Sequence, residues 1–179
     1  MKKFLFLILI MIMLSINVYA KMDLVYDGVN HVYEGPDVTL IINNKKFIPT
    51  EGLLPPLILD DRTLVPVREV FEMMGGVVDW DGTERSVTIT ADSKSVKLWI
   101  DKTTALVDGK EISLDVPAKI INDKTMVPVR FISENCGFIV GWDGETKTVT
   151  VDSPEIVIVW LTADTRVREA FVPDCVEVE

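Results

Sequence analysis

The chain has 179 residues, of which 48% are apolar and 26% are charged, with 18 Lys and Arg against 28 Asp and Glu. The apolar fraction excludes a disordered chain, and the formal charge of -10 argues against nucleic acid as a partner, because phosphate binding depends on Lys and Arg. The single histidine excludes any metal or catalytic site that needs two imidazoles.

The first twenty residues have the layout of a secretory signal peptide. Lys2 and Lys3 precede an unbroken apolar run from Phe4 to Leu14, and small residues lead to Ala20. The run is shorter than the roughly 20 apolar residues that span a membrane. We therefore expect cleavage after Ala20 and a secreted or cell-surface protein, with membrane contact only if this segment stays uncleaved.

An internal repeat dominates the rest of the sequence. Residues 61–89 and 123–151 align without a gap at an offset of 62, and 14 of the 29 positions are identical. Such self-similarity predicts two copies of one structural unit. The chain is accordingly divided into a signal peptide, a leader, a first repeat, a second repeat and a tail that adds a strand, with the bounds 1–20, 21–36, 37–91, 92–152 and 153–179.

Each repeat contains one segment with helical periodicity. Between Pro66 and Gly75, apolar residues recur at the spacing i, i+3, i+4 and i+7, which predicts a helix of two to three turns. Proline is common where a helix begins and glycine where it ends. The second repeat has the same pattern between Pro128 and Gly137.

After each helix the apolar period changes to two, as in half-buried strands. Asp-Gly pairs at positions 81–82, 108–109 and 143–144 separate these strands, and such pairs favour tight hairpin turns. Hairpins give antiparallel sheets. The predicted fold class is α+β, with two tandem repeats that are each a small antiparallel sheet packed around one short helix.

The strings DRTLVPVREVFEMMGGVVDWD and DKTMVPVRFISENCGFIVGWD resemble the N-terminal stalk module of copper amine oxidase-like proteins. The resemblance extends over Val38 to Asp152, and the leader YDGVNHVYEG also resembles the start of such surface proteins. It implies a non-catalytic module of exported Gram-positive proteins, sometimes placed ahead of an N-acetylmuramoyl-L-alanine amidase domain. It does not imply copper, because the family's amine oxidase site would need three His ligands and this chain has His31 alone.

Arg68 and Arg130 occupy the same helix position in the two repeats, with Glu72 and Glu134 four residues later. They could clamp a carboxylate or phosphate. We favour a structural role, as a helical ion pair or as a bond from the helix to the sheet. The shared residues of the motif are likewise assigned to folding: Pro66, Arg68, Gly75, Asp81, Pro128, Arg130, Gly137 and Asp143.

Three tryptophans are candidate ligand contacts. Trp80 and Trp142 each precede an Asp-Gly pair and could stack on sugar rings, although we favour packing at the edge of the core, with the Asp bonding turn amides. Trp99 alternates away from the apolar residues of its strand. It is therefore the best of the three candidates for an exposed contact.

No metal or cofactor is expected. The sequence from Asp79 to Gly82 is similar to a fragment of a calcium loop, but Thr90 stands where the bidentate Glu would be required. Cys136 and Cys175 could form a disulfide in an exported protein. Cys136 also occupies the inward helix position matched by Met74, where a thiol packs as a small apolar group, so both alternatives stay open.

These features predict a non-enzymatic, exported cell-envelope module that acts as a spacer or as a contact surface for wall glycan or another envelope protein. The alternative is a dedicated glycan-binding or peptide-binding module that uses its exposed tryptophans. A fragment of a peptidoglycan hydrolase is the least favoured reading, because no nucleophile, base and orienting group form a recognisable set.

Overall fold

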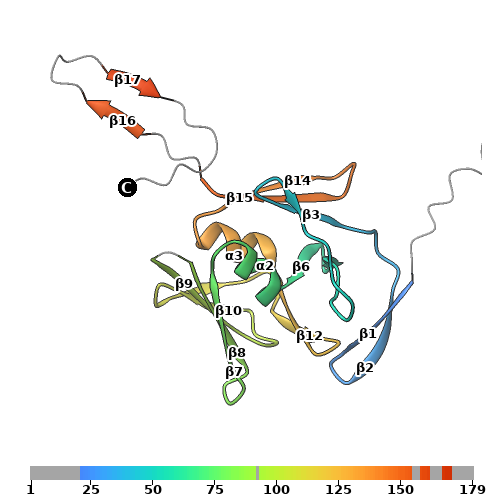
Figure 1. Ribbon diagram of the computed structural model, residues 1–179. Helices are drawn as coiled ribbons and strands as arrows, with labels where there is room; N and C mark the ends of the chain where they lie inside the picture. The colour runs from blue at the N-terminus through green and yellow to red at the C-terminus, as the bar shows by residue number, and fades with distance from the viewer. Residues whose placement is uncertain (1–20, 92, 155–157, 162–166, 171–179) are drawn as a thin grey trace, which may run out of the picture.

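The computed structural model describes residues 21–91, 93–154, 158–161 and 167–170 of the chain (Figure 1). The predicted signal peptide lies outside these residues, so cleavage after Ala20 stays a prediction. The described part is mostly β, with two short helices. None of its helices has the length and apolar content to cross a membrane.

The leader forms a hairpin of β1 (Met22–Tyr26) and β2 (Val29–Tyr33). Its turn is Asp27-Gly28, where both residues have positive φ, as two-residue hairpin turns require. Leu24 and Tyr33 are buried in a core cluster with residues of both repeats. The leader is thus part of the packed structure.

A four-stranded sheet in the order β12-β13-β6-β5 joins the two repeats. It consists of β5 (Leu57–Leu59), β6 (Arg62–Pro66), β12 (Lys119–Ile121) and β13 (Lys124–Pro128). The matched strands β6 and β13 pair antiparallel, with Val65 opposite Val127. Equivalent residues therefore face one another across an approximate two-fold axis.

The helices α2 (Val67–Met73) and α3 (Val129–Asn135) confirm the predicted helical segments. Both helices end in a Schellman motif. The amides of Gly75 and Gly76 donate to the carbonyls of Glu72 and Phe71. In the second repeat the amides of Gly137 and Phe138 donate to the carbonyls of Glu134 and Ser133. Gly75 and Gly137 have φ of +78° and +92°, a conformation that glycine adopts without strain.

A five-stranded antiparallel sheet follows α2, in the order β11-β10-β9-β8-β7. Its strands are β7 (Val77–Asp81), β8 (Ser86–Ala91), β9 (Lys94–Trp99), β10 (Thr104–Val107) and β11 (Lys110–Ser113). Buried positions alternate along β8 and β9, as their apolar period predicts.

A second four-stranded sheet has the order β14-β15-β3-β4. It contains β14 (Ile139–Asp143), β15 (Thr148–Asp152), β3 (Thr39–Ile42) and β4 (Lys45–Lys46), and β15 pairs parallel with β3. In the tail, β16 (Ile158–Leu161) pairs antiparallel with β17 (Val167–Ala170). Within the described residues, the strand expected from the tail pairs with β17 and not with β15.

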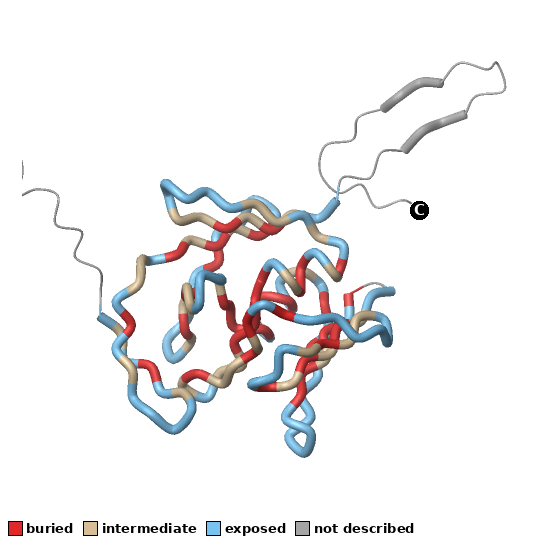
Figure 2. Tube along the Cα trace, turned by 180° about the vertical axis from the view of Figure 1, so that it is seen from behind, coloured by how far each residue is buried: buried red, intermediate tan, exposed pale blue. Residues whose placement is uncertain are grey.

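The predicted fold class is wrong. The two repeats are not separate α+β units with one sheet around one helix, because β6 pairs with β13 and β3 pairs with β15. One core cluster contains Val65, Phe71, Val127 and Ile132, so its buried residues come from both repeats. Figure 2 shows the buried segments along the chain in red. A seven-residue helix has too little apolar surface to cover a sheet, and each repeat completes its core with strands of the other.

Candidate functional site

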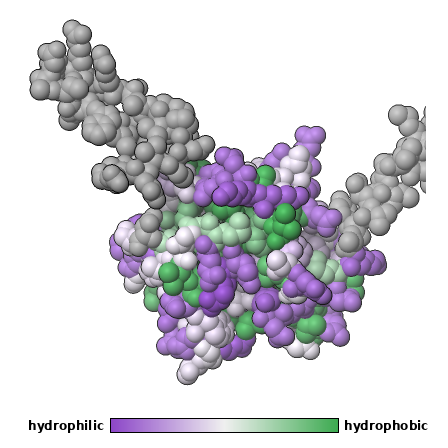
Figure 3. Space-filling model, viewed as in Figure 1, coloured by the Kyte–Doolittle hydropathy of each residue, from purple (hydrophilic) through white to green (hydrophobic). Residues whose placement is uncertain are grey.

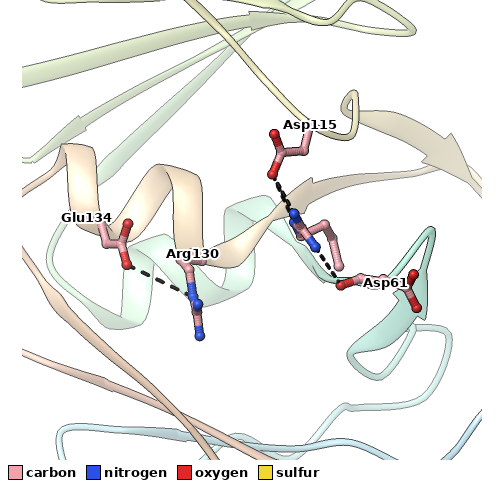
Figure 4. A network of polar contacts seen from close by, with 5 residues as sticks. Asp61, Asp115, Arg130 and Glu134 are labelled. Carbon is pink, nitrogen blue, oxygen red and sulfur yellow. Dashed lines mark hydrogen bonds and ion pairs between the residues drawn. The ribbon is translucent and has the colours of Figure 1, made fainter.

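A groove of about 600 Å³ opens between α3, β14 and the β5–β6 hairpin. Its polar lining comes from the two sequence repeats and from the loop before β12. Arg130 and Glu134 lie on α3, and Asp61 and Asp115 approach from the opposite side (Figure 4). The groove therefore exists only because the two repeats are packed together.

Arg62 holds one wall of the groove in place. Its Nε and Nη2 donate to Asp115 Oδ2 at 3.2 and 2.5 Å, and its Nη1 donates to the carbonyl of Asp61 at 3.1 Å. This fork connects the β5–β6 turn to a loop more than fifty residues away in sequence. Because the pair is solvent-exposed, it orients these side chains more than it stabilises the fold.

Arg130 lies on the first turn of α3, on the side of the groove opposite Arg62. Its Nε is 4.0 Å from Glu134 Oε1, and among the described residues this carboxylate is its only ion-pair partner. The matching Arg68 in the first repeat is held more firmly. Its Nη1 is 3.3 Å from Glu72 and donates to the carbonyl of Val78 at 2.9 Å. The predicted bond from helix to sheet is thus present in the first repeat. In the second repeat, Arg130 lines the groove.

Trp142 and Trp80 have nearly the same local structure and different surroundings. They are 41% and 40% exposed, and the indole Nε1 of each lies near the glycine of its own turn, 3.5 Å from where a Cβ would stand. Trp142 lines the groove, whereas Trp80 does not. Of the two, only Trp142 lines the same groove as the charged groups described above.

The expectation that Trp99 is the best exposed contact is wrong. Its side chain is half-buried, and Lys97 Nζ lies 5.2 Å from the centre of its ring. Strand alternation correctly places both residues on the same face of β9. It does not reveal that the lysine covers the ring, because that depends on side-chain packing.

Asp81 and Asp143 bond the amides of their own turns. Asp81 Oδ1 accepts from Thr83 and Glu84 at 2.8 and 3.1 Å, and Asp143 Oδ1 accepts from Glu145 and Thr146 at 2.8 and 3.2 Å. The pKa of Asp81 is lowered by the amides of Glu84 and then Thr83, and that of Asp143 by the amide and hydroxyl of Thr146 and then the Glu145 amide. Both carboxylates have a structural partner in the folded chain.

The remaining candidates lie away from the groove. Cys136 is buried at the end of α3, and burial raises the pKa of its thiol to about 11, so it is protonated at neutral pH. Cys175 lies outside the described residues, and the disulfide stays a prediction. His31 stacks on Tyr26 within the leader hairpin, with ring centres 3.8 Å apart.

The acidic pairs of the sequence do not gather into a metal site in the part of the chain that the structure describes. Asp60 and Asp61 both have positive φ and form the β5–β6 hairpin turn. A second cavity, of about 750 Å³, lies between the leader and β12 and has Asp27, Asp101 and Arg85 among its lining residues. Lys119 crosses to Asp27 at 3.0 Å and so ties the leader to β12.

Sequence reasoning missed Arg62, Asp115 and Phe131 as groove residues. The repeat alignment concentrates on shared positions, and none of these three belongs to them. Their signal lies in the differences: Arg62 matches Lys124, and Phe131 matches Glu69. Positions where two copies of a unit differ are where one copy can acquire a surface that the other lacks.

On the face seen in Figure 1, apolar residues lie in patches among polar residues (Figure 3). A search of curated proteins found no significant match to the chain. A comparison with protein families matched residues 41–151 to the copper amine oxidase N-terminal domain, a span that contains both repeated segments. Because this match covers more than half of the sequence, the chain belongs to the copper amine oxidase N-terminal domain family.

Proposed function

We propose that this protein is a non-catalytic, exported module of the cell envelope that binds a wall glycan or peptide in the groove at α3. The observation that carries the proposal is the position of Trp142, which is solvent-exposed and lines the same groove as the Arg62–Asp115 fork. Its counterpart Trp80 is 40% exposed, against 41% for Trp142, and does not line this groove.

The chemistry of the groove suits a neutral or weakly charged polar ligand. An indole face packs against the apolar face of a sugar ring, and a guanidinium–carboxylate fork offers fixed donors and acceptors for adjacent hydroxyl or amide groups. Two arginines and three carboxylates line the groove, so their charges nearly cancel. A polyanion gains little attraction from such a lining.

A binding role without catalysis agrees with the family, whose matched domain is the non-catalytic N-terminal part of copper amine oxidases. The carboxylates of Asp115 and Glu134 lie within ion-pair distance of arginines, and both are exposed to solvent. The buried Cys136 thiol is a poor nucleophile because its raised pKa keeps it protonated.

The signal-like residues 1–20 support export, and an exported protein meets the glycan and peptide of the cell wall. Cleavage can be tested by N-terminal sequencing of protein recovered from the culture medium or cell surface. A chain that begins at Lys21 would support the proposal. A chain that keeps Phe4 to Leu14 would instead favour a membrane-tethered module.

The binding proposal can be tested by sedimenting residues 21–179 with purified peptidoglycan. We expect the wild-type chain and Trp80→Ala to sediment equally, and Trp142→Ala to lose at least tenfold in affinity because stacking on the ligand is lost. The two variants are matched in exposure and local packing, so Trp80→Ala controls for general effects of removing an indole.

Two other outcomes would contradict the proposal. If none of the chains sediments with the wall, the spacer role predicted from the sequence is favoured over ligand binding. If both tryptophan variants lose binding equally, the contact does not involve the groove.

A further inference from the structure

The five-stranded sheet and the β14-β15-β3-β4 sheet correspond strand by strand except at one place. The strands β7 and β8 match β14 and β15 at the repeat offset. The strands β10 and β3 each lead through a two-residue turn of positive φ into an edge strand, β11 and β4. The central strand β9 has no counterpart between β15 and β3.

Strand direction and register indicate that β15 and β3 pair directly at the position that β9 occupies in the five-stranded sheet. In the five-stranded sheet, Lys97 of β9 lies between Thr88 and Leu106, and β8 and β10 are both antiparallel to β9. They are therefore parallel to each other. In the other sheet Thr150, which matches Thr88, pairs directly with Ile41 of β3, and the pairing is parallel. Removing a central antiparallel strand from a five-stranded sheet gives this direction and this register.

The chain contains a strand at the sequence position of the missing one. β9 includes Val96–Trp99, and the repeat offset of 62 leads from these residues to Ile158–Leu161, the bounds of β16. In the structure β16 pairs antiparallel with β17, and this pairing has to be released before both edges of β16 can pair with β15 and β3. The sequence IVIVWL at residues 156–161 is continuously apolar, which is typical of a strand buried on both faces.

We propose that the junction between β15 and β3 is a strand-insertion site and that its occupant is β16 of the same chain. β16 enters antiparallel to both neighbours, with Ile158 opposite Val151 and Val159 between Thr150 and Ile41. The result is a five-stranded antiparallel sheet equivalent to β11-β10-β9-β8-β7. The parallel arrangement described above is the state in which the site is closed.

Insertion exchanges two ladders for two others: the parallel β15–β3 ladder and the antiparallel β16–β17 ladder are replaced by antiparallel ladders of β16 with β15 and with β3. The gain is the replacement of one parallel pairing by an antiparallel one, which is slightly more stable per residue. Insertion also breaks the hydrogen bonds that hold the closed junction, among them those from the amides of Thr39 to Lys147 and of Asn43 to Val151, both at 3.0 Å. Pro154 would be unfavourable in a two-residue hairpin turn, whose first residue needs positive φ. A longer connection built on a type I turn accepts it, because proline is favoured at the second position of that turn.

The test uses pairs of cysteines introduced into residues 21–179, with Cys175→Ser to remove the tail thiol and a short thiol-specific cross-linker. Thr150→Cys/Val159→Cys reports insertion, and Thr150→Cys/Ile41→Cys reports the closed junction, since insertion separates these two positions by about 10 Å. Thr88→Cys/Lys97→Cys is the positive control, because these residues already pair in the five-stranded sheet.

We expect Thr150→Cys/Val159→Cys to cross-link within one chain, to at least half the extent of the positive control. Adding Ile158→Pro should reduce this cross-link at least fivefold, because proline cannot donate to a central strand. The Thr88→Cys/Lys97→Cys pair carrying the same proline should be unaffected, which separates failed insertion from failed folding.

Cross-linking of Thr150→Cys/Ile41→Cys alone, with none between positions 150 and 159, would overturn the proposal. Cross-linked dimers whose amount rises with protein concentration would also overturn it, because the occupant would then be a second copy. Neither result depends on wall binding.

Discussion

The helices α2 and α3 are copies in sequence and backbone, yet they lie in different surroundings. Both are seven residues long, begin after a proline and end at a glycine of positive φ. Phe71 fills the core beneath α2, whereas the matching Ser133 is buried with a hydroxyl that has no partner among the described residues. On the side of the helix away from this core position, the polar and apolar residues are exchanged: α2 has Glu69, and α3 has the matching Phe131, which lines the groove. Shared residues therefore preserve the element, and unlike residues decide what it contacts.

The largest expected effect tests this difference in the core. Phe71→Ala should lower the free energy of unfolding by about 3–5 kcal/mol, because it removes a fully buried ring and leaves a cavity. Ser133→Ala is the matched control, and it should leave stability unchanged or raise it by about 1 kcal/mol, because it removes an unpaired hydroxyl. Urea denaturation measures both. Equal losses would show that the two helices are buried in equivalent ways.

The helix ends should respond alike in the two repeats. Gly75→Ala and Gly137→Ala should each cost roughly 1–2 kcal/mol in stability, because alanine is strained at the positive φ of these positions. Gly82→Ala is the control, since Gly82 does not have positive φ and a Cβ there meets only Trp80 Nε1 at 3.5 Å. Thermal unfolding of the three variants checks this, and a cost confined to one helix would break the comparison.

The two motif arginines should differ. Arg68→Gln should cost about 1 kcal/mol, because Arg68 bonds the carbonyl of Val78 as well as Glu72. Arg130→Gln should change stability by less than about 0.5 kcal/mol, because an exposed ion pair such as that of Arg130 with Glu134 contributes little. Chemical denaturation at two salt concentrations distinguishes the two interactions of Arg68, because salt screens its ion pair with Glu72 more than its hydrogen bond to the carbonyl of Val78. A larger loss at Arg130 would mean that it, too, anchors its helix.

The smallest effect concerns pH. The pKa values of Asp81 and Asp143 are lowered from 3.8 by amides of their turns, so their stabilising contribution is present above about pH 4 and is lost as the pH falls through the folded-state values. The Asp81→Ala/Asp143→Ala chain should therefore lose less stability between pH 5 and pH 3 than the wild type. Urea midpoints across this range provide the measurement, and parallel curves would contradict it.

Local features of the fold could be predicted because their causes are local. The prolines and glycines around α2 and α3, the alternation along β8 and β9 and the Asp108-Gly109 turn act through neighbouring residues. The sequence correctly predicts where the turns at Asp81 and Asp143 lie, but it does not predict their backbone conformation. Positive φ occurs at Arg85 and Lys147 instead of at the Asp-Gly pairs, because the aspartates bond amides further along the turn.

The groove could not be predicted, because its residues are distant in sequence and belong to both repeats. Arg62 and Asp115 meet only after β6 has paired with β13. The exposure of the tryptophans was misjudged for a related reason. The alternation of residues along a strand predicts on which face of the sheet a side chain lies. It does not predict whether other side chains cover it there, because that depends on tertiary packing.

The sequence by itself determined the repeat, the two capped helices, the hairpins and the family of this protein, since each depends on residue order over short distances. Only the tertiary structure decided that the repeats share their sheets, that Arg68 is anchored while Arg130 faces a groove, and that β15 lies against β3. Strand edges carry the same backbone groups whatever their sequence, so the choice of partner depends on how the whole core closes.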